Sequence, residues 1–185
     1  AVDVYANDKI IAKNLAFSNF TEYIPVTKGM YNIKVYAVGT TKNPVIDQDV
    51  FLPGYKIFTI AAIGKLENIS LKSISDTRKI LKPGKSMVRF IHLSPNAPEV
   101  DVTLPDGKIV FDNVSYKEVT DYLEIEPGLY RFDVKLSSNG DNVLTVPNVR
   151  LKSDKIYSIY AIGLAGDEPA LQVVIPLDGN TYLKF

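Results

Sequence analysis

Apolar and polar residues alternate over short stretches of this chain, and the alternation predicts β-strands throughout. In residues 100–104 (VDVTL), the two valines and the leucine fall on one face of a strand, while the aspartate and the threonine fall on the other. Two stretches, residues 56–64 and 155–163, carry apolar side chains on both faces, which is typical of a central strand. Gly, Pro, Asn and Asp separate these segments at regular short intervals, so the pattern favours an all-β sandwich or barrel.

The chain repeats itself with a period of 99 residues. The segment that starts at Lys9 aligns without gaps with the segment that starts at Lys108, with 17 identities in 56 aligned pairs. A period of this length predicts two whole domains, because solenoid repeats are much shorter. We place the first domain at residues 1–76 and the second at residues 87–185, joined by a short linker at residues 77–86 that contains a Lys-Pro-Gly-Lys sequence.

Composition removes several classes of function. Lys plus Arg and Asp plus Glu both total 21, so the net charge is zero and nucleic-acid binding is disfavoured. The chain has no cysteine, which excludes disulfides, zinc–cysteine sites and thiol catalysis. No apolar stretch approaches the roughly 20 residues of a membrane span. The first residues, AVDVYAND, do not resemble a secretion signal, so we expect any such signal to be removed or absent.

One motif resembles a known family. His92, Ser94, Pro95, Ala97 and Pro98 form an H-x-S-P-x-A-P sequence that precedes a Val-Asp-Val strand at residues 100–102. This motif resembles the opening of DUF4397, an uncharacterised family of extracellular bacterial repeats. The resemblance covers essentially the whole chain as two copies. It implies two tandem Ig-like antiparallel β-sandwich domains, exported to the cell envelope or the medium, and it implies no known activity.

The first copy lacks the beginning of this motif. It starts at Ala1-Val2-Asp3-Val4, and nothing in the sequence corresponds to the VRFIHLSPNAP that precedes Val100. A sandwich without a strand exposes unpaired backbone groups and apolar surface. We therefore expect an open edge in the first domain, covered by the C-terminal tail (residues 180–185), by the linker, or by a neighbouring molecule through self-association.

The only histidine lies close to a serine. His92 and Ser94 share a strand face, and Asp101 is a conceivable third member of a hydrolase triad. However, the sequence shows neither a glycine elbow nor an oxyanion hole. The structural interpretation is that His92 and Ser94 bind backbone at a strand-to-turn junction, which Pro95 and Pro98 stiffen.

Carboxylates offer only weak candidate sites. With one histidine and no cysteine, oxygen ligands for calcium are the remaining option for a metal. The candidate carboxylates are Asp101 with Asp106, Asp3 with Asp8, Asp141, and Asp167 with Glu168, and none follows a calcium-loop spacing. Glu124 and Glu126 share a strand face, but such pairs usually form a solvated surface rather than a glycosidase site. We expect no metal and no cofactor.

The chain is rich in aromatic residues, with 11 Tyr and 8 Phe. Most recur in both copies, which favours core packing. Asp154 and Tyr157 resemble the tyrosine corner of Ig-type domains, whereas Phe58 in the first copy lacks the hydroxyl. The aromatic residues without a counterpart are candidates for a ligand or interface surface: Tyr36, Phe51, Tyr55 and Tyr160.

These features predict a non-catalytic, exported interaction or spacer module of the cell envelope, with a cell-surface protein or a glycan as its partner. Two alternatives remain open. A carbohydrate-binding module would use exposed tyrosines clustered on one face, and a hydrolase would be centred on His92 with a carboxylate and an open pocket around it.

Overall fold

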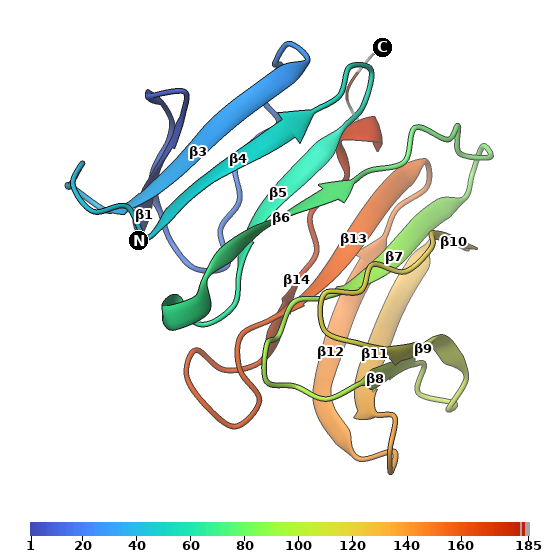
Figure 1. Cartoon of the computed structure of the whole chain (residues 1–185). Coiled ribbons are helices and arrows are strands. Elements are labelled where there is room, and N and C mark those ends of the chain that lie inside the picture. Colours follow the sequence, from blue (N-terminus) through green and yellow to red (C-terminus); the bar gives the residue numbers. More distant parts are fainter. Residues whose placement is uncertain (182, 184–185) are drawn as a thin grey trace. The chain divides into compact units, whose positions relative to one another are not determined.

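The computed structural model describes residues 1–181 and 183. The chain divides into two compact units, Ala1–Arg78 (unit 1) and Lys79–Phe185 (unit 2), which Figure 1 shows in blue to green and in green to red. The predicted all-β fold is confirmed, since the described residues form strands and two short 3-10 helices. No helix in this part of the chain has the length and apolar character that a membrane span requires.

Unit 1 contains a four-stranded sheet and a separate hairpin. The sheet has the order β2-β1-β3-β4, and all its pairings are antiparallel. The hairpin pairs β5 with β6. The elements are β1 (Val2–Ala6), β2 (Lys9–Leu15), β3 (Gly29–Ala37), β4 (Ile46–Leu52), β5 (Phe58–Ile63), the 3-10 helix η1 (Leu66–Asn68) and β6 (Ser70–Ser75).

The core of unit 1 lies between its sheet and its hairpin. Ile33 and Val35 of β3 and Val50 of β4 are buried, because alternate residues of these strands point to the same face. Ile60 of β5 and Leu71 of β6 pack against this cluster but remain partly exposed.

Unit 2 contains two four-stranded sheets. Their orders are β10-β7-β13-β14 and β12-β11-β8-β9. All pairings are antiparallel except that of β7 with β13. The elements are β7 (Ser86–His92), β8 (Val100–Thr103), β9 (Ile109–Val114), β10 (Leu123–Ile125), β11 (Gly128–Leu136), β12 (Asn142–Leu151), β13 (Lys155–Ile162), β14 (Gln172–Val174) and the 3-10 helix η2 (Gly179–Thr181).

Strands from both sheets of unit 2 supply one core. All seven residues of β7 are buried, and Phe90 packs in the same cluster as Phe132 of β11 and Ile159 of β13. The two-sided apolar pattern of residues 155–163 therefore marks a central strand, because β13 lies between β7 and β14.

The two units share their strand order except that the described residues of unit 1 form no counterpart of β7 or of β10. β1, β2, β3 and β4 correspond to β8, β9, β11 and β12, and β5 corresponds to β13. No strand among residues 1–181 and 183 takes the place of β7 in unit 1, where β5 pairs only with β6. The absent motif of the first copy thus corresponds to a strand.

The C-terminal tail and the linker were expected to cover this edge. Tyr182, Lys184 and Phe185 lie outside the described residues, so this expectation stays a prediction. Asn180 and Thr181 contact unit 2, where the Asn180 side-chain amide donates to the Lys79 carbonyl at 2.8 Å.

Candidate functional site

The His92 motif is a buried junction between β7 and the loop that follows it. The His92 side chain is only 1% exposed, and its Nδ1 accepts a hydrogen bond from the Ser94 backbone N–H at 3.3 Å. Because Nδ1 is an acceptor, the proton of the neutral ring lies on Nε2, which donates to the Pro98 carbonyl at 3.0 Å. Burial lowers the pKa of His92, which keeps the ring uncharged at neutral pH.

The structure does not join His92, Ser94 and Asp101 into a triad. The Ser94 hydroxyl is fully buried and has no hydrogen-bond partner in the described part of the chain. Asp101 instead accepts from the Asn113 backbone N–H at 2.8 Å and from the Ser137 hydroxyl at 2.6 Å. In this geometry Ser94 and Asp101 do not engage the ring nitrogens through their side chains.

Asp154 and Tyr157 close the turn between β12 and β13. The Tyr157 hydroxyl accepts a hydrogen bond from the Lys152 backbone N–H at 3.1 Å. Asp154 has a positive φ of 60° and accepts from the Gly84 backbone N–H at 2.9 Å. Both residues therefore fix backbone, as in a tyrosine corner.

The two carboxylates of the predicted strand face are paired with lysines. Glu124 lies 3.2 Å from the Lys82 ammonium, and Glu126 forms an ion pair with Lys85. The ion pair raises the pKa of Lys85 through its hydrogen bond to Glu126. Across the described residues, no group of three or more acidic, histidine or cysteine side chains could hold a metal ion.

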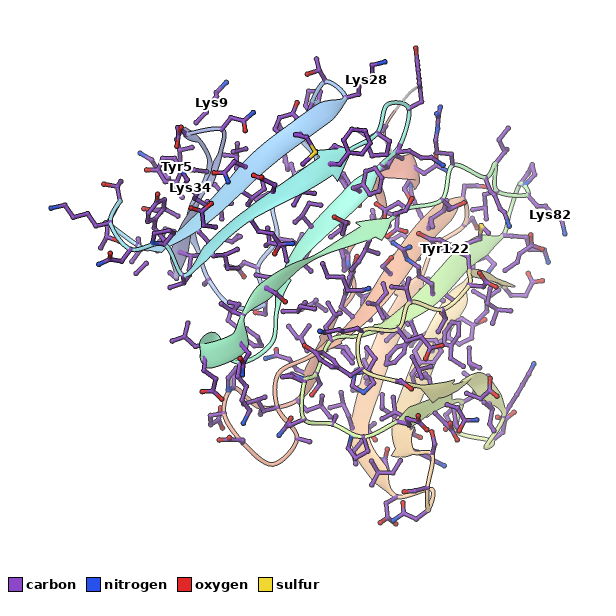
Figure 2. All side chains as sticks on the ribbon, in the orientation of Figure 1. Tyr5, Lys9, Lys28, Lys34, Lys82 and Tyr122 are labelled. Carbon is purple, nitrogen blue, oxygen red and sulfur yellow. The ribbon has the colours of Figure 1, made fainter. Side chains whose placement is uncertain are left out.

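The candidate aromatic residues of the unit 1 sheet lie apart from each other. Tyr36 is half-buried and packs edge to face against Tyr5, with ring centroids 5.5 Å apart (Tyr5 is labelled in Figure 2). Phe51 is exposed and pairs across the strands with Met30, at the other end of β3 from Tyr36. Along a strand, this separation of six residues is about 20 Å, which is too far for one sugar platform.

The other two aromatic candidates differ in exposure. Tyr55 is 92% exposed in the loop after β4, whereas Tyr160 is buried in β13. Tyr160 is therefore not available to a surface ligand. The four residues do not form one exposed face.

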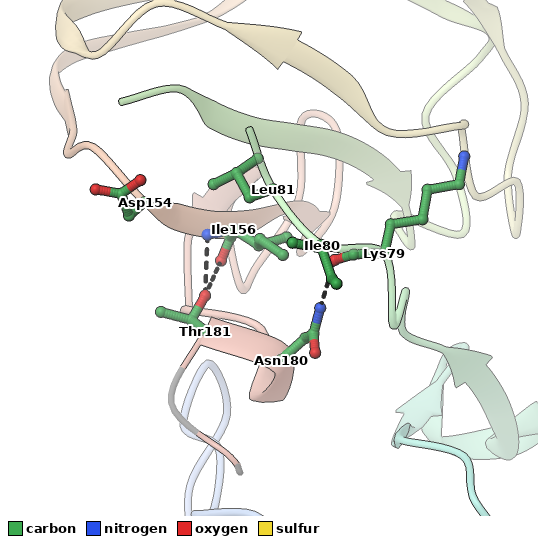
Figure 3. A pocket seen from close by; sticks show the side chains of 7 residues that line it. All are labelled: Lys79, Ile80, Leu81, Asp154, Ile156, Asn180 and Thr181. Carbon is green, nitrogen blue, oxygen red and sulfur yellow. Dashed lines mark hydrogen bonds between the residues drawn. The ribbon is translucent and has the colours of Figure 1, made fainter. Parts of the chain in front are cut away.

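A groove in unit 2 lies where the chain enters this unit. Figure 3 shows its lining, which comprises Lys79, Ile80, Leu81, Asp154, Ile156, Asn180 and Thr181. The Thr181 hydroxyl accepts from the Ile156 N–H at 2.9 Å and donates to the Ile156 carbonyl at 3.2 Å. These contacts fasten η2 to β13, and they bring no pair of acidic groups together.

Unit 2 holds a buried arginine that the sequence analysis did not identify. Arg89, in the middle of β7, is 1% exposed, and its Nε donates to the Ser158 hydroxyl at 2.7 Å. Its guanidinium lies 3.5 Å from the Asp178 carboxylate and 4.5 Å from the ring centroid of Tyr122 (labelled in Figure 2). Asp178 also accepts hydrogen bonds from the Ser158 and Tyr122 hydroxyls. These contacts compensate the charge of an arginine that would otherwise be costly to bury.

Unit 1 contains the same set of groups around β5. Tyr23 and Thr59 stand where unit 2 has Tyr122 and Ser158, 99 residues later. The Asp76 backbone N–H donates to the carbonyl of Ile57, just before β5, at 2.9 Å, and the Asp178 N–H donates to the carbonyl of the equivalent residue Ile156, in β13, at 2.9 Å. The Tyr23 hydroxyl donates to the Asp76 carboxylate and lies 3.2 Å from the Thr59 hydroxyl. We call Tyr23, Thr59 and Asp76 the unit 1 polar cluster.

The segment before β3 in unit 1 exposes three apolar side chains. In unit 2, Val119 forms a bridge with β7, and β10 pairs with it from Leu123 to Ile125. The counterparts in unit 1 are Phe20, Ile24 and Val26, which are 61%, 46% and 54% exposed.

Strand β5 also has a more exposed residue than its counterpart β13 at one matched position. Ala62 of β5 is exposed, whereas its counterpart Ala161 in β13 is buried. Among the described residues, β5 therefore has β6 as its one strand partner, whereas β13 pairs with both β7 and β14.

The comparisons with known proteins identify the family. The family described as "Domain of unknown function (DUF4397)" matches residues 1–103 and 104–182, so the chain belongs to this family, with two segments consistent with two tandem copies. No curated protein matches the chain.

Among solved structures, the chain is similar to the C-terminal domain of AlgF from P. aeruginosa. The identity is 20%, the match covers 51% of this chain and 98% of that chain, and the TM-score is 0.38. It is also similar to a "putative cell adhesion protein" from Bacteroides ovatus ATCC 8483, with 11% identity, coverage of 96% and 86%, and a TM-score of 0.29. Similarities at this level carry no argument about function.

Proposed function

We propose that this protein is a non-catalytic interaction or spacer module, exported to the cell envelope or its surroundings. The observation that carries the proposal is the exposed apolar segment of unit 1, in which Phe20, Ile24 and Val26 are 61%, 46% and 54% exposed. Contiguous apolar surface of this kind marks interaction sites in soluble proteins. A cell-surface protein is the partner class that such a surface fits best.

The buried motif supports the non-catalytic part of the proposal. A general base needs a ring nitrogen within reach of the proton that it removes. In His92 one nitrogen binds the Ser94 N–H and the other binds the Pro98 carbonyl, which leaves the ring in a structural role. An export role agrees with the cysteine-free sequence and with the resemblance of its motif to extracellular repeats.

The test combines location with binding. Protease treatment of intact cells of the source organism should degrade the protein before any cytoplasmic marker. Labelled protein should also bind washed envelopes, and replacement of Phe20, Ile24 and Val26 by serine should weaken this binding at least about tenfold, since buried side chains of this size each contribute more than 1 kcal/mol.

A matched control keeps the result specific. The variant Met30→Ser removes an equally exposed apolar side chain from another part of unit 1, and it should leave envelope binding unchanged. A protein found only in the cytoplasm, or a hydrolytic activity that His92→Ala abolishes while the fold persists, would rule out the proposed function.

A further inference from the structure

We propose that Asn139, in the turn between β11 and β12 of unit 2, is a site of spontaneous covalent modification. Its side-chain amide is converted to a carboxylate with release of ammonia, and the product loosens the tip of this hairpin. Figure 1 shows the turn as the connection between the two strands, and residues 138–143 are all exposed. The reaction is independent of the interaction role proposed above.

The chemistry needs only water in addition to the chain. The backbone nitrogen of Gly140 attacks the side-chain carbon Cγ of Asn139, and the new C–N bond closes a five-membered succinimide ring. The side-chain nitrogen leaves as ammonia, since it takes up the equivalent of the proton that the attacking nitrogen loses. Water then opens the ring. Attack at one ring carbonyl gives aspartate, and attack at the other gives isoaspartate, in which the backbone runs through the former side chain.

The residue that follows Asn139 leaves the reacting atoms accessible. Asn139 is the one asparagine of the sequence that is followed by glycine. A Cβ built on Gly140 would meet no atom within 4 Å, so neither its own side chain nor a neighbour crowds the attacking nitrogen. In the same hairpin, Asn142 and Asn148 are each followed by valine, whose branched side chain lies next to the nitrogen that would attack.

The turn also places a donor on the oxygen that becomes negative. The Asp141 backbone N–H donates to the Asn139 Oδ1 at 3.0 Å. When the nitrogen of Gly140 adds to Cγ, negative charge develops on this oxygen, and a donor that is already in place stabilises it. The hydrogen bond therefore favours ring closure.

The closed hairpin slows the attack. The Gly140 N–H donates to the Leu136 carbonyl at 2.8 Å, so the attacking nitrogen is engaged until the tip opens. Hairpin tips open locally at little cost in free energy. One hydrogen bond of this kind should slow the reaction about three- to tenfold relative to a free peptide of the same sequence.

The product cannot keep the contacts of the asparagine. The Asn139 Nδ2 donates to the Asp141 Oδ2 at 2.7 Å, and in aspartate an oxygen takes the place of this nitrogen. Two carboxylates then face each other and repel. In isoaspartate the backbone gains one methylene group, which moves the Gly140 N–H away from the Leu136 carbonyl. Both products therefore weaken the tip of the hairpin.

The test follows the three asparagines of this hairpin in one peptide. The full chain is incubated at neutral and at mildly alkaline pH and then digested with trypsin, which cuts after Lys135 and Arg150 and releases residues 136–150. By mass spectrometry with fragmentation, Asn139 should convert at least about tenfold faster than Asn142 or Asn148, because valine hinders the attack at those sites. The rate should rise with pH, since the attacking nitrogen must lose its proton.

Two variants test the effect of the product on the hairpin. Asn139→Asp reproduces the aspartate product, and it should speed amide hydrogen exchange at Gly140 and Asp141 about three- to tenfold, because one hydrogen bond is lost and a repulsion is added. The matched control Ser138→Asp adds the same charge to the same turn and keeps the Asn139 amide, so it should leave exchange at these two amides nearly unchanged.

Three results would overturn the inference. The first is an Asn139 that stays intact in the folded chain while the synthetic peptide of residues 136–150 converts completely. The second is conversion of Asn142 or Asn148 at the same rate as Asn139. The third is equal hydrogen exchange at Gly140 and Asp141 in Asn139→Asp and in Ser138→Asp, which would show that the product does not loosen the hairpin.

Discussion

The variant Asp178→Asn tests how the buried arginine of unit 2 is held. Arg89 and Asp178 are both almost fully buried, and the variant removes the negative charge that faces the guanidinium at 3.5 Å while it keeps the shape of the side chain. Removal of one partner from a buried ion pair typically costs about 3–5 kcal/mol, because a charge stays buried without its counterion. Since small domains are stable by only about 5–15 kcal/mol, the loss should be large in unit 2.

The measurement is urea unfolding followed by tyrosine fluorescence, with hydrogen exchange of β7 and β13 to assign the transition to unit 2. A matched control is Arg131→Met, because the Arg131 side chain is 51% exposed and its partner Asp133, 3.0 Å away, keeps its hydrogen bond from the Thr145 hydroxyl. Ion pairs with a solvated partner contribute about 0–1 kcal/mol, so this variant should change unfolding little.

A double variant separates the pair from its surroundings. Arg89→Met combined with Asp178→Asn should cost less than the sum of the two single changes by at least about 1 kcal/mol, since the second change no longer exposes an unpaired charge. If Asp178→Asn costs no more than Arg131→Met, or if the two single costs simply add, the pair does not stabilise the fold in the way we describe.

Three further predictions concern unit 2. Burial lowers the pKa of His92 below its ordinary value of 6.5, so the unfolded chain binds a proton more readily than the folded chain. The free energy of unfolding should therefore fall as the pH drops below about 6.5, by up to roughly 1.4 kcal/mol per pH unit. Urea unfolding at several pH values should show a flatter pH dependence for His92→Gln. Tyr157→Phe should cost about 1 kcal/mol in the same assay at neutral pH, because the hydrogen bond that closes the β12–β13 turn is lost, and an unchanged midpoint would contradict that role. Gly163→Ala should lower the melting temperature well below that of Gly140→Ala, since both glycines have positive φ but only at Gly163 would a Cβ meet a backbone oxygen, at 2.2 Å; equal melting temperatures would refute the reasoning.

Periodicity and repetition were enough to predict the fold. The alternation of apolar residues identified the strands, and the 99-residue period identified the two copies. The burial of Tyr160 could have been predicted from the sequence. It was singled out because Ala61 replaces it in the first copy, yet it belongs to the two-sided apolar stretch that predicted a central, buried strand.

The buried polar contacts of Arg89 in unit 2 could not be predicted from the local sequence pattern. Arg89 stands among apolar residues in VRFIHL, and this was the one local signal for a buried charge. Its partners Ser158 and Asp178 come from positions at least 69 residues later, and only the parallel pairing of β7 with β13 brings them together. Recurrence of Tyr23 and Tyr122 in both copies was visible in the sequence, but strand pairing over such distances depends on topology rather than on neighbours.

The pairing of β7 with β13 also has a consequence for biogenesis. Arg89 in β7 pairs with Ser158 in β13, 69 residues later, so unit 2 cannot complete its fold until nearly all of its chain has been synthesised. Loop closure over this length slows folding. During that interval the nascent strand can join the wrong neighbour, and strand exchange between similar tandem domains is a characteristic failure of such proteins. Synthesis from the N-terminus makes the timing of each repeat, as well as its final energy, part of how the chain reaches its native state.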